Sequence, residues 1–309
     1  MALLDVILLY DCNLACDYCT ITPAMRARSL ATDAVLRELR AGRTAGFDEV
    51  SFTGGEPTVR PDLLGLVRAA RALGYRRVKV QSNGLVLGQG DNAARLVAAG
   101  CDDLHVSIHT HAADAYDALV RRPDSHALME AGVRAGVATG VTVTVDLIIT
   151  ASTMDRLADA VAWAAARGVA GVDLWFVSLT DGNRANLASM PRMTEAMPHV
   201  HAALAVGRAR GLAMRSLHVP RCLLGRDVDH AFDPGAGRVR VVSPDAVFEL
   251  AQSKLTGQHH VDACAGCRYR AVCPGLRADY LARFGDDEVV AARPAMAGNP
   301  TPPAPAQPP

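Results

Sequence analysis

The chain has 309 residues, half of them hydrophobic, which suffices for one large core or for a core with a small appended module. Its 32 basic and 32 acidic residues cancel, so no overall field would draw it onto nucleic acid or an anionic membrane. The first ten residues lack a basic start, which argues against a signal peptide, and no run of about 18 uncharged apolar residues predicts a membrane span. We therefore expect a cytoplasmic protein, in which eight cysteines point to metal ligation rather than to a disulfide framework.

From residue 5 to about residue 178, short β-rich runs alternate with amphipathic helical segments. The strand-like runs are residues 5–11, 48–53, 76–82, 103–109, 141–149 and 171–178. The helical segments are residues 31–45, 61–73, 90–99, 126–138 and 153–167. This alternation is typical of parallel βαβ units. Six strands are too few for a closed eight-stranded barrel, so we predict an α/β fold with a partial (β/α)6 barrel and active-site loops at the carboxyl ends of the strands.

After residue 185 the pattern is less regular. A helical segment at 193–210 is followed by four of the eight cysteines and by a β-rich piece, 237–249, which reads as a hairpin turning at Ser243-Pro244-Asp245. We predict a barrel core over 1–185, a small irregular iron–sulfur extension over 186–290, and a proline-rich disordered tail over 291–309.

Three cysteines, Cys12, Cys16 and Cys19, follow the first predicted strand within eight residues. Three neighbouring thiolates can hold three corners of a [4Fe–4S] cluster and leave the fourth iron open for another ligand. The alternatives are a zinc site that lacks its fourth ligand, or three packed core thiols. The loop also contains two aspartates and an asparagine, which makes it a poor place for inert buried thiols.

At these cysteines the chain resembles the radical S-adenosylmethionine superfamily, whose hallmark is this spacing. The family usually has an aromatic residue before the third cysteine, and Tyr18 stands there. The resemblance implies that the open iron binds S-adenosylmethionine, and that one electron splits this cofactor into methionine and a 5′-deoxyadenosyl radical. It also implies a reductant, such as flavodoxin or ferredoxin, as a partner.

The second predicted strand ends in Gly54, Gly55 and Glu56. Glycines let the backbone approach a ligand closely, and a carboxylate beside them can neutralise an ammonium group. These residues match the Gly-Gly-Glu of the family, which holds the methionyl amino group of the cofactor.

Residues at the ends of the later strands match further family positions. The resemblance implies that hydroxyls of Ser82 and Ser107 contact the ribose and methionine parts of the cofactor, and we expect Asn83 and Tyr18 to bind the cofactor as well. Asn83 and the glycine after it also fit an ordinary turn. Ile148 and Phe176 are our candidates for stacking against adenine, and plain core packing is the alternative for both.

Two histidines, His109 and His111, follow the fourth strand on the side where the active site is expected. A histidine there can move a proton to or from a substrate, so His109 is the candidate catalytic residue; a satisfied histidine at the solvent edge is the alternative. Asp146 lies within the fifth strand and needs either a partner or a ligand.

Four further cysteines, Cys222, Cys264, Cys267 and Cys273, make a complete ligand set for a structural zinc ion or for a second [4Fe–4S] cluster. This region is similar to the auxiliary-cluster extensions called SPASM or twitch, and four cysteines instead of seven imply a version with a single cluster. The last cysteine, Cys101, precedes the fourth strand and is expected to be a buried structural thiol.

We therefore expect an enzyme that abstracts a hydrogen atom from a substrate carbon, for oxidation or dehydrogenation, epimerisation or cross-linking. A small-molecule substrate is favoured, because the first cluster cysteine at position 12 leaves no room before it for a domain that grips a leader peptide. A maturase of ribosomally made peptides is the alternative, since a separate protein can bind the leader. A non-catalytic iron–sulfur or zinc protein is a second, more remote alternative. Neither nucleic acid nor membrane is expected as a partner.

Overall fold

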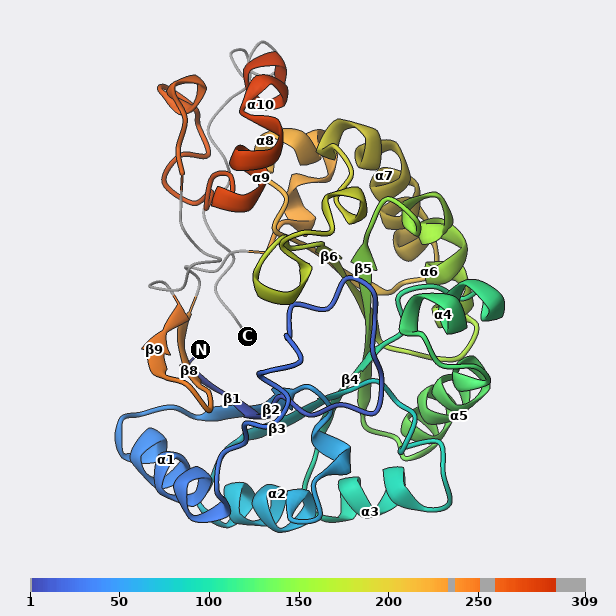
Figure 1. The fold of residues 1–309 in the computed structure, drawn as a ribbon, viewed down its shortest axis with the longest axis vertical. Helices are drawn as coiled ribbons and strands as arrows, with labels where there is room; N and C mark the ends of the chain where they lie inside the picture. Colours follow the sequence, from blue (N-terminus) through green and yellow to red (C-terminus); the bar gives the residue numbers. More distant parts are fainter. Residues whose placement is uncertain (1, 233–236, 251–258, 293–309) are drawn as a thin grey trace.

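A curved, mostly parallel sheet lies at the centre of the fold (Figure 1). The computed structural model describes residues 2–232, 237–250 and 259–292. The strands of this part are β1 (Ala2–Leu9), β2 (Glu49–Gly54), β3 (Arg77–Ser82), β4 (Asp103–Ser107), β5 (Thr142–Ile149), β6 (Gly171–Phe176), β7 (Ala213–Leu217), β8 (Arg238–Val242) and β9 (Val247–Glu249). Their spatial order is β7-β6-β5-β4-β3-β2-β1-β8-β9, and all neighbours are parallel except the antiparallel pair of β8 and β9.

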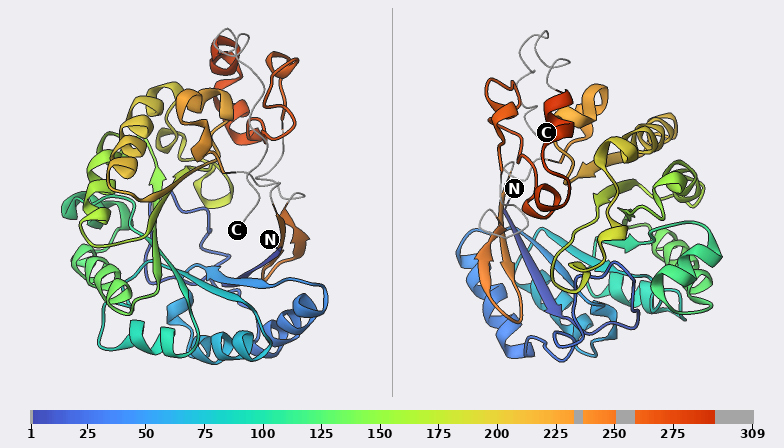
Figure 2. Two further views of the ribbon diagram at one scale, coloured as in Figure 1. Left: turned by 180° about the vertical axis from the view of Figure 1, so that it is seen from behind. Right: turned by 45° about the horizontal axis from the view of Figure 1, so that its top comes forward.

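Helices cover the convex side of the sheet, as both views in Figure 2 also show. They are α1 (Thr32–Thr44), α2 (Leu63–Ala72), α3 (Asn92–Ala98), α4 (Ala113–Val120), α5 (Ser125–Ala138), α6 (Leu157–Ala165) and α7 (Met193–Ala209). Three short helices, α8 (Arg221–Leu224), α9 (Ala278–Phe284) and α10 (Asp287–Ala292), lie together beyond α7. In α2 the side chains that face the sheet recur at helical spacing: Leu63, Leu66, Val67 and Ala70.

The two faces of the strands differ in chemistry, as β1 illustrates. Leu4, Val6 and Leu8 are fully buried beneath the helices, and each contributes about 1.5–3 kcal/mol of hydrophobic stabilisation. Leu3 and Asp5 alternate with them and point to the concave side, where they line an internal cavity. The concave side of the sheet is thus available for polar side chains.

The predicted α/β fold with a partial barrel is confirmed, and each of the six predicted strands is present. The helices α4, α8, α9 and α10 were not predicted, nor was the seventh parallel strand β7, which pairs with β6. The predicted hairpin at 237–249 is confirmed as β8 and β9, but it also extends the main sheet, because β8 pairs with β1. The division into core and extension stays a prediction, and residues 293–309 of the predicted tail lie outside the described residues.

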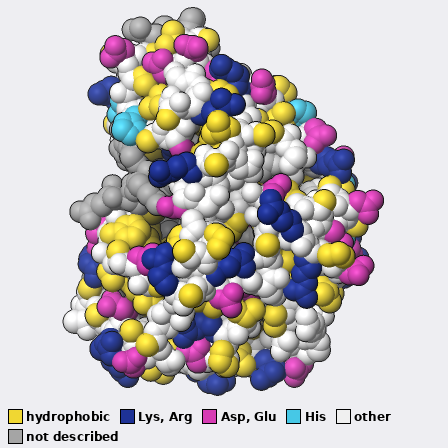
Figure 3. Space-filling view, in the orientation of Figure 1, with side chains coloured by type: hydrophobic (Ala, Val, Ile, Leu, Met, Phe, Trp, Pro, Cys, Tyr) yellow, Lys and Arg dark blue, Asp and Glu magenta, His cyan; other side chains and the backbone are white. Residues whose placement is uncertain are grey.

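Within the described ranges, no helix is both long and apolar enough to cross a membrane. On the face shown in Figure 3, basic and acidic side chains are interspersed rather than gathered into one patch. This distribution agrees with the balanced formal charge of the chain.

Candidate active site

The loop after β1 carries the three cysteines of the first motif. Burial, reinforced by the neighbouring Cys19 thiol, raises the pKa of Cys12 to about 11 and that of Cys16 to about 12. Arg26 holds the loop, because its guanidinium donates hydrogen bonds to the carbonyl oxygens of Cys12 (3.0 Å) and Leu14 (2.7 Å). Cys12, Cys16 and Cys19 all line one cavity, so they are close enough to share one metal cluster, and ligation would remove their protons.

A cavity of about 320 Å³ opens between this loop and the carboxyl ends of β2 to β6. It brings together most of the residues that the sequence singled out: Cys12, Cys16, Tyr18, Cys19, Gly54, Gly55, Ser82, Asn83, Ser107, His109, Ile148 and Phe176. Thiols, hydroxyls, an amide and apolar side chains thus face one space. That this space holds the cofactor stays a prediction here.

The two glycines at the end of β2 are required by the cysteine loop. A Cβ atom on Gly54 would lie 2.3 Å from the carbonyl oxygen of Leu9, and one on Gly55 would lie 2.1 Å from that of Asp11. The amides of Gly55 and Glu56 donate to these same two oxygens, at 2.8 and 2.9 Å. The sequence predicts glycines here for the close approach of a ligand, but the neighbour that excludes side chains is the protein backbone.

Glu56 lies differently from what its motif suggested, because its fully buried carboxylate does not line the cavity. The carboxylate accepts hydrogen bonds from the Thr58 amide (2.9 Å), the Ser82 hydroxyl (2.9 Å) and the Asn83 amide (2.6 Å). Burial raises the pKa of Glu56, and these hydrogen bonds oppose the rise. Its carboxylate therefore joins the ends of β2 and β3, and a direct contact with a cofactor stays a prediction.

Several predicted residues serve the fold and the cavity at once. The Asn83 side chain accepts from the amide of Leu85 (3.1 Å), as in a turn, and donates to the Asn13 side chain (2.7 Å) in the cysteine loop. Phe176 is 2% exposed and packs edge-on against Tyr280, with ring centroids 5.9 Å apart, yet it also lines the cavity. The alternatives considered for Asn83 and Phe176 are therefore compatible with cofactor contacts.

His109 lies in the cavity wall in a left-handed backbone conformation, with φ of 56°. Its Nε2 is 2.6 Å from the Tyr18 hydroxyl, and its buried Nδ1 has no partner among the described residues. Burial lowers the pKa of His109 to about 4, so the ring is neutral at pH 7. His111 does not line the cavity, which corrects the expectation that both histidines face it.

The four remaining motif cysteines meet around a second cavity, of about 190 Å³. Cys222 comes from α8, while Cys264, Cys267 and Cys273 come from the irregular segment before α9. Burial, and then the other three thiols, raise the pKa of Cys222 to about 12. Four thiols that line one pocket fit a metal centre with four thiolate ligands. Cys101, by contrast, is buried alone at 2% exposure, as expected.

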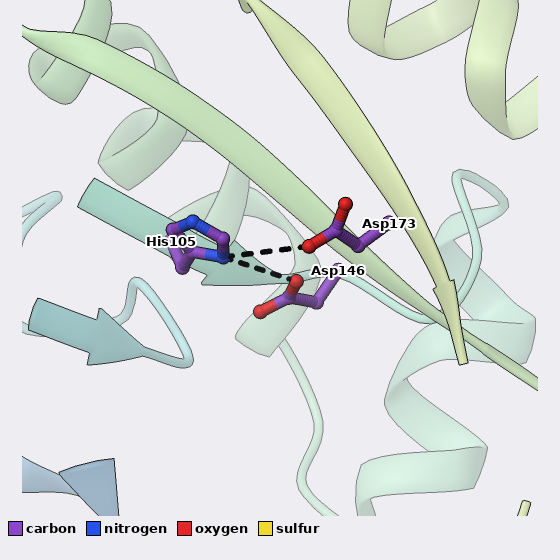
Figure 4. Close-up of side chains that lie close together, drawn as sticks. All are labelled: His105, Asp146 and Asp173. Carbon is purple, nitrogen blue, oxygen red and sulfur yellow. Dashed lines mark hydrogen bonds and ion pairs between the residues drawn. The ribbon is translucent and has the colours of Figure 1, made fainter. Parts of the chain in front are cut away.

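Asp146 lies in a buried polar network with His105 and Asp173 on the concave side of the sheet (Figure 4). His105 Nδ1 lies 3.2 Å from Asp146 Oδ1 and 4.0 Å from Asp173 Oδ2. The Gln81 amide and the Trp175 indole donate to the two Asp146 oxygens, at 2.9 and 3.2 Å. Burial alone would raise the pKa of Asp146, but its contact with His105 lowers it below the usual value. Asp146 therefore has partners and positions two residues of the cavity wall.

Gln81, Trp175 and His218 also line the first cavity and were not predicted from the sequence. The signal for the first two was the period of the strand, because each lies two residues after a charged residue of the same face, Lys79 or Asp173. His218 follows β7, a strand that was not predicted, so no strand end pointed to it.

Comparisons with known proteins agree with this geometry. Residues 6–164 match the family model of the radical SAM superfamily. A GTP 3′,8-cyclase of Streptomyces coelicolor is 36% identical over 161 residues, which cover 50% of this chain and 46% of that protein. Human molybdenum cofactor biosynthesis protein 1 is 32% identical over 148 residues, covering 44% of this chain and 22% of that protein. The matches thus span less than half the length of these curated relatives.

Solved structures share the fold at low sequence identity. Streptococcus suis SuiB superposes with a TM-score of 0.57 at 14% identity, covering 69% of this chain and 48% of that chain. The structure titled "Native anSMEcpe with bound AdoMet" gives a TM-score of 0.56 at 13% identity, covering 69% and 62%. These likenesses establish the architecture alone.

A partial barrel of parallel strands, with a three-cysteine loop at its mouth, defines the class of enzymes that build their chemistry on an iron–sulfur cluster at the carboxyl ends of the strands. The family match over half of the chain makes the assignment specific: the chain belongs to the radical SAM superfamily and is a radical SAM enzyme. The family implies a [4Fe–4S] cluster and S-adenosylmethionine as its cofactors.

Proposed function

We propose that this enzyme cleaves S-adenosylmethionine reductively and abstracts a hydrogen atom from a carbon of a small-molecule substrate. The observation that carries the proposal is the cavity at the strand ends, in which three thiols face glycines, hydroxyls and an amide that match the family's cofactor positions. The donor set fits the cluster, because three thiolates leave one iron open for an exogenous ligand.

Each side of the cavity has its own task in this proposal. Cys12, Cys16 and Cys19 hold the cluster, and the backbone of Gly54 and Gly55 borders the methionyl end of the cofactor. The hydroxyls of Ser82 and Ser107, with the Asn83 amide, orient its polar parts. Ile148 and Phe176 provide the apolar wall for adenine. When bound, the reduced cluster and the cofactor supply one-electron bond cleavage and, through it, hydrogen-atom abstraction.

We assign the second group of cysteines to an auxiliary [4Fe–4S] cluster, with zinc as the alternative occupant. Its four thiols leave no iron open, so electron transfer or structural support is its role rather than substrate ligation. An electron acceptor beside the barrel suits a net oxidation of the substrate. The cluster at the barrel mouth needs a one-electron donor such as flavodoxin or ferredoxin, and free cysteines suit the reducing cytoplasm.

Anaerobic reconstitution with iron and sulfide, followed by dithionite and S-adenosylmethionine, tests the proposed reaction. We expect the wild-type enzyme to release 5′-deoxyadenosine and Cys16→Ala to release none, because two thiolates do not hold the cluster. Cys101→Ala is the matched control, since it removes a buried thiol that lines neither cysteine cavity and should retain cleavage. A wild-type protein that carries its full iron content yet releases no 5′-deoxyadenosine would instead be a non-catalytic iron–sulfur protein.

A further inference from the structure

A third cavity, of about 300 Å³, lies on the concave side of the sheet, directly next to the cavity at the strand ends. Gln81, Trp175 and His218 line both spaces and form their common wall. A molecule in the inner cavity therefore borders the place where the proposed hydrogen abstraction starts. Its size is that of a small metabolite.

Most charges in the inner cavity already have partners. Arg77 donates to Asp103 (2.6 Å) and lies 3.7 Å from Glu49, and Arg215 donates to both oxygens of Asp173. Paired side chains such as these are satisfied without a ligand, because each charge is compensated within the protein.

The cluster of His105, Asp146 and Asp173 also has its hydrogen-bond partners within the protein, and we do not assign it as a cation site. Its carboxylates accept from Arg215, Gln81 and Trp175 as well as lying beside the histidine (Figure 4). A divalent cation would have to compete with these donors and with a fixed guanidinium charge. The cluster instead gives the cavity a rigid polar floor.

Two opposite charges remain without a hydrogen bond or an ion pair among the lining residues that the structure describes: Asp5 on β1 and Lys79 on β3. Lys79 is near enough to Asp146 to help lower the pKa of that carboxyl, but the two side chains form no ion pair. Asp5 and Lys79 both pair in register with Ser51 on the strand between them, and the buried Ser51 hydroxyl has no hydrogen-bond partner within the described part of the chain. Two strand spacings separate the Cα atoms of Asp5 and Lys79 by roughly 10 Å. Keeping a half-buried charge without an ion pair costs folding free energy, and a bound ligand of opposite charge would offset that cost.

We propose that the inner cavity binds a free α-amino acid, with its ammonium group at Asp5 and its carboxylate at Lys79. The side chain of the amino acid then lies against the apolar wall formed by Leu3, Leu217, Phe232 and Val239. This proposal names the substrate class and so rests on the proposed function. A polyphosphate fits less well, because in the described lining one cation alone is unpaired. An internal peptide residue fits less well because it carries neither charge.

The test is direct binding to the reconstituted enzyme with S-adenosylmethionine and without reductant, under anaerobic conditions. The twenty free L-amino acids are screened by thermal shift, and calorimetry then compares the best binder with three analogues: its decarboxylated amine, its deaminated acid and its N-acetyl amide. We expect the free amino acid to bind at least tenfold more tightly than each analogue, since each analogue lacks one or both charges.

Two near-isosteric variants test which protein charge binds which charged group of the amino acid. Asp5→Asn should bind the amino acid and its deaminated acid equally well. Lys79→Met should bind the amino acid and its decarboxylated amine equally well. Asp33→Asn and Arg68→Met, on exposed helix surfaces, are the matched controls and should leave both preferences unchanged. Should either inner variant fail to fold, the analogue series on the wild-type enzyme still decides the question.

Absence of binding by all twenty amino acids overturns the proposal, and so does equal binding of the N-acetyl amide, which would point to a peptide. Release of 5′-deoxyadenosine, measured on the same wild-type sample, separates this outcome from failure of the proposed function. Release without amino-acid binding refutes the substrate class alone, whereas binding without release refutes the radical reaction.

Discussion

His109 combines a strained backbone with a ring that is kept neutral. A positive φ is uncommon for a residue with a Cβ atom and persists where the surroundings hold it in place. Here the Tyr18 hydroxyl holds the ring, and Tyr18 itself lies between two cluster cysteines in the sequence. A neutral imidazole beside the proposed cofactor site can accept a proton, as the proton-transfer role predicted for His109 requires.

The low pKa of His109 has a consequence for stability. The unfolded chain protonates this residue near pH 6.5, whereas the folded protein does so near pH 4, so folding becomes less favourable as the pH falls between these values. From pH 7 to pH 5 the loss is about 2 kcal/mol at this residue. Urea unfolding of the metal-free protein should therefore show that His109→Gln loses about 2 kcal/mol less than the wild type over this range.

His259→Gln, which changes an exposed histidine, is the control and should follow the wild type. If His109→Gln and the wild type lose equal stability between pH 7 and pH 5, the ring of His109 is protonated in the folded protein and is not held neutral.

At the scale of elements, the ends of β2 and β3 are fixed to each other by one carboxylate. Glu56 extends from the end of β2 to the Ser82 hydroxyl and the Asn83 amide at the end of β3. Both Ser82 and Asn83 line the cofactor cavity, so Glu56 positions them without facing that cavity itself. This arrangement gives the Gly-Gly-Glu motif a structural reason in addition to the role implied by the family.

Glu56→Gln should lower the free energy of unfolding by about 1–3 kcal/mol, because the new amide places a donor against backbone donors in a buried site. Urea unfolding measures the change, and Glu38→Gln on α1, whose side chain makes no hydrogen bond among the described residues, should stay within about 0.5 kcal/mol of the wild type. A Glu56→Gln protein of unchanged stability that no longer binds S-adenosylmethionine would show instead that the carboxylate contacts the cofactor.

A strand is easier to predict from the sequence when β-branched and apolar residues dominate it than when charged residues lie on its inner face. Strands such as β5, with apolar residues on the helix side, were predicted from their β-branched enrichment. β7 was missed because it is short and carries Arg215 on its inner face, where the charge is compensated by Asp173 of β6. Such a pairing depends on residues 42 positions apart, which local patterns do not report. The cysteine motifs were visible from spacing alone, whereas the partners of Asp146 became visible only in the fold.

At the scale of the whole molecule, the segment with the second cysteine group is anchored to the barrel beside the proposed cofactor cavity. Arg277 donates to the carbonyl oxygens of Phe176 (3.2 Å) and Val177 (3.1 Å) at the end of β6. The carboxylate of Asp279 accepts from the amide of Leu179 at 2.8 Å. A centre held by the second cysteine group therefore has a fixed position relative to the strand ends, as an electron acceptor for the barrel would need.

This arrangement makes a prediction about metal content. If the second group holds a [4Fe–4S] cluster, the anaerobically reconstituted wild-type enzyme should contain about eight irons. The double variant Cys264→Ala/Cys267→Ala, which leaves two thiolates at that site, should contain about four. The barrel cluster should survive in this variant, because its three ligands come from the loop after β1, so 5′-deoxyadenosine release should continue. Cys101→Ala removes a thiol from neither group and should retain eight irons. Elemental analysis that finds about four irons and one zinc in the wild type would identify the second site as a zinc site and remove electron transfer through it from the mechanism.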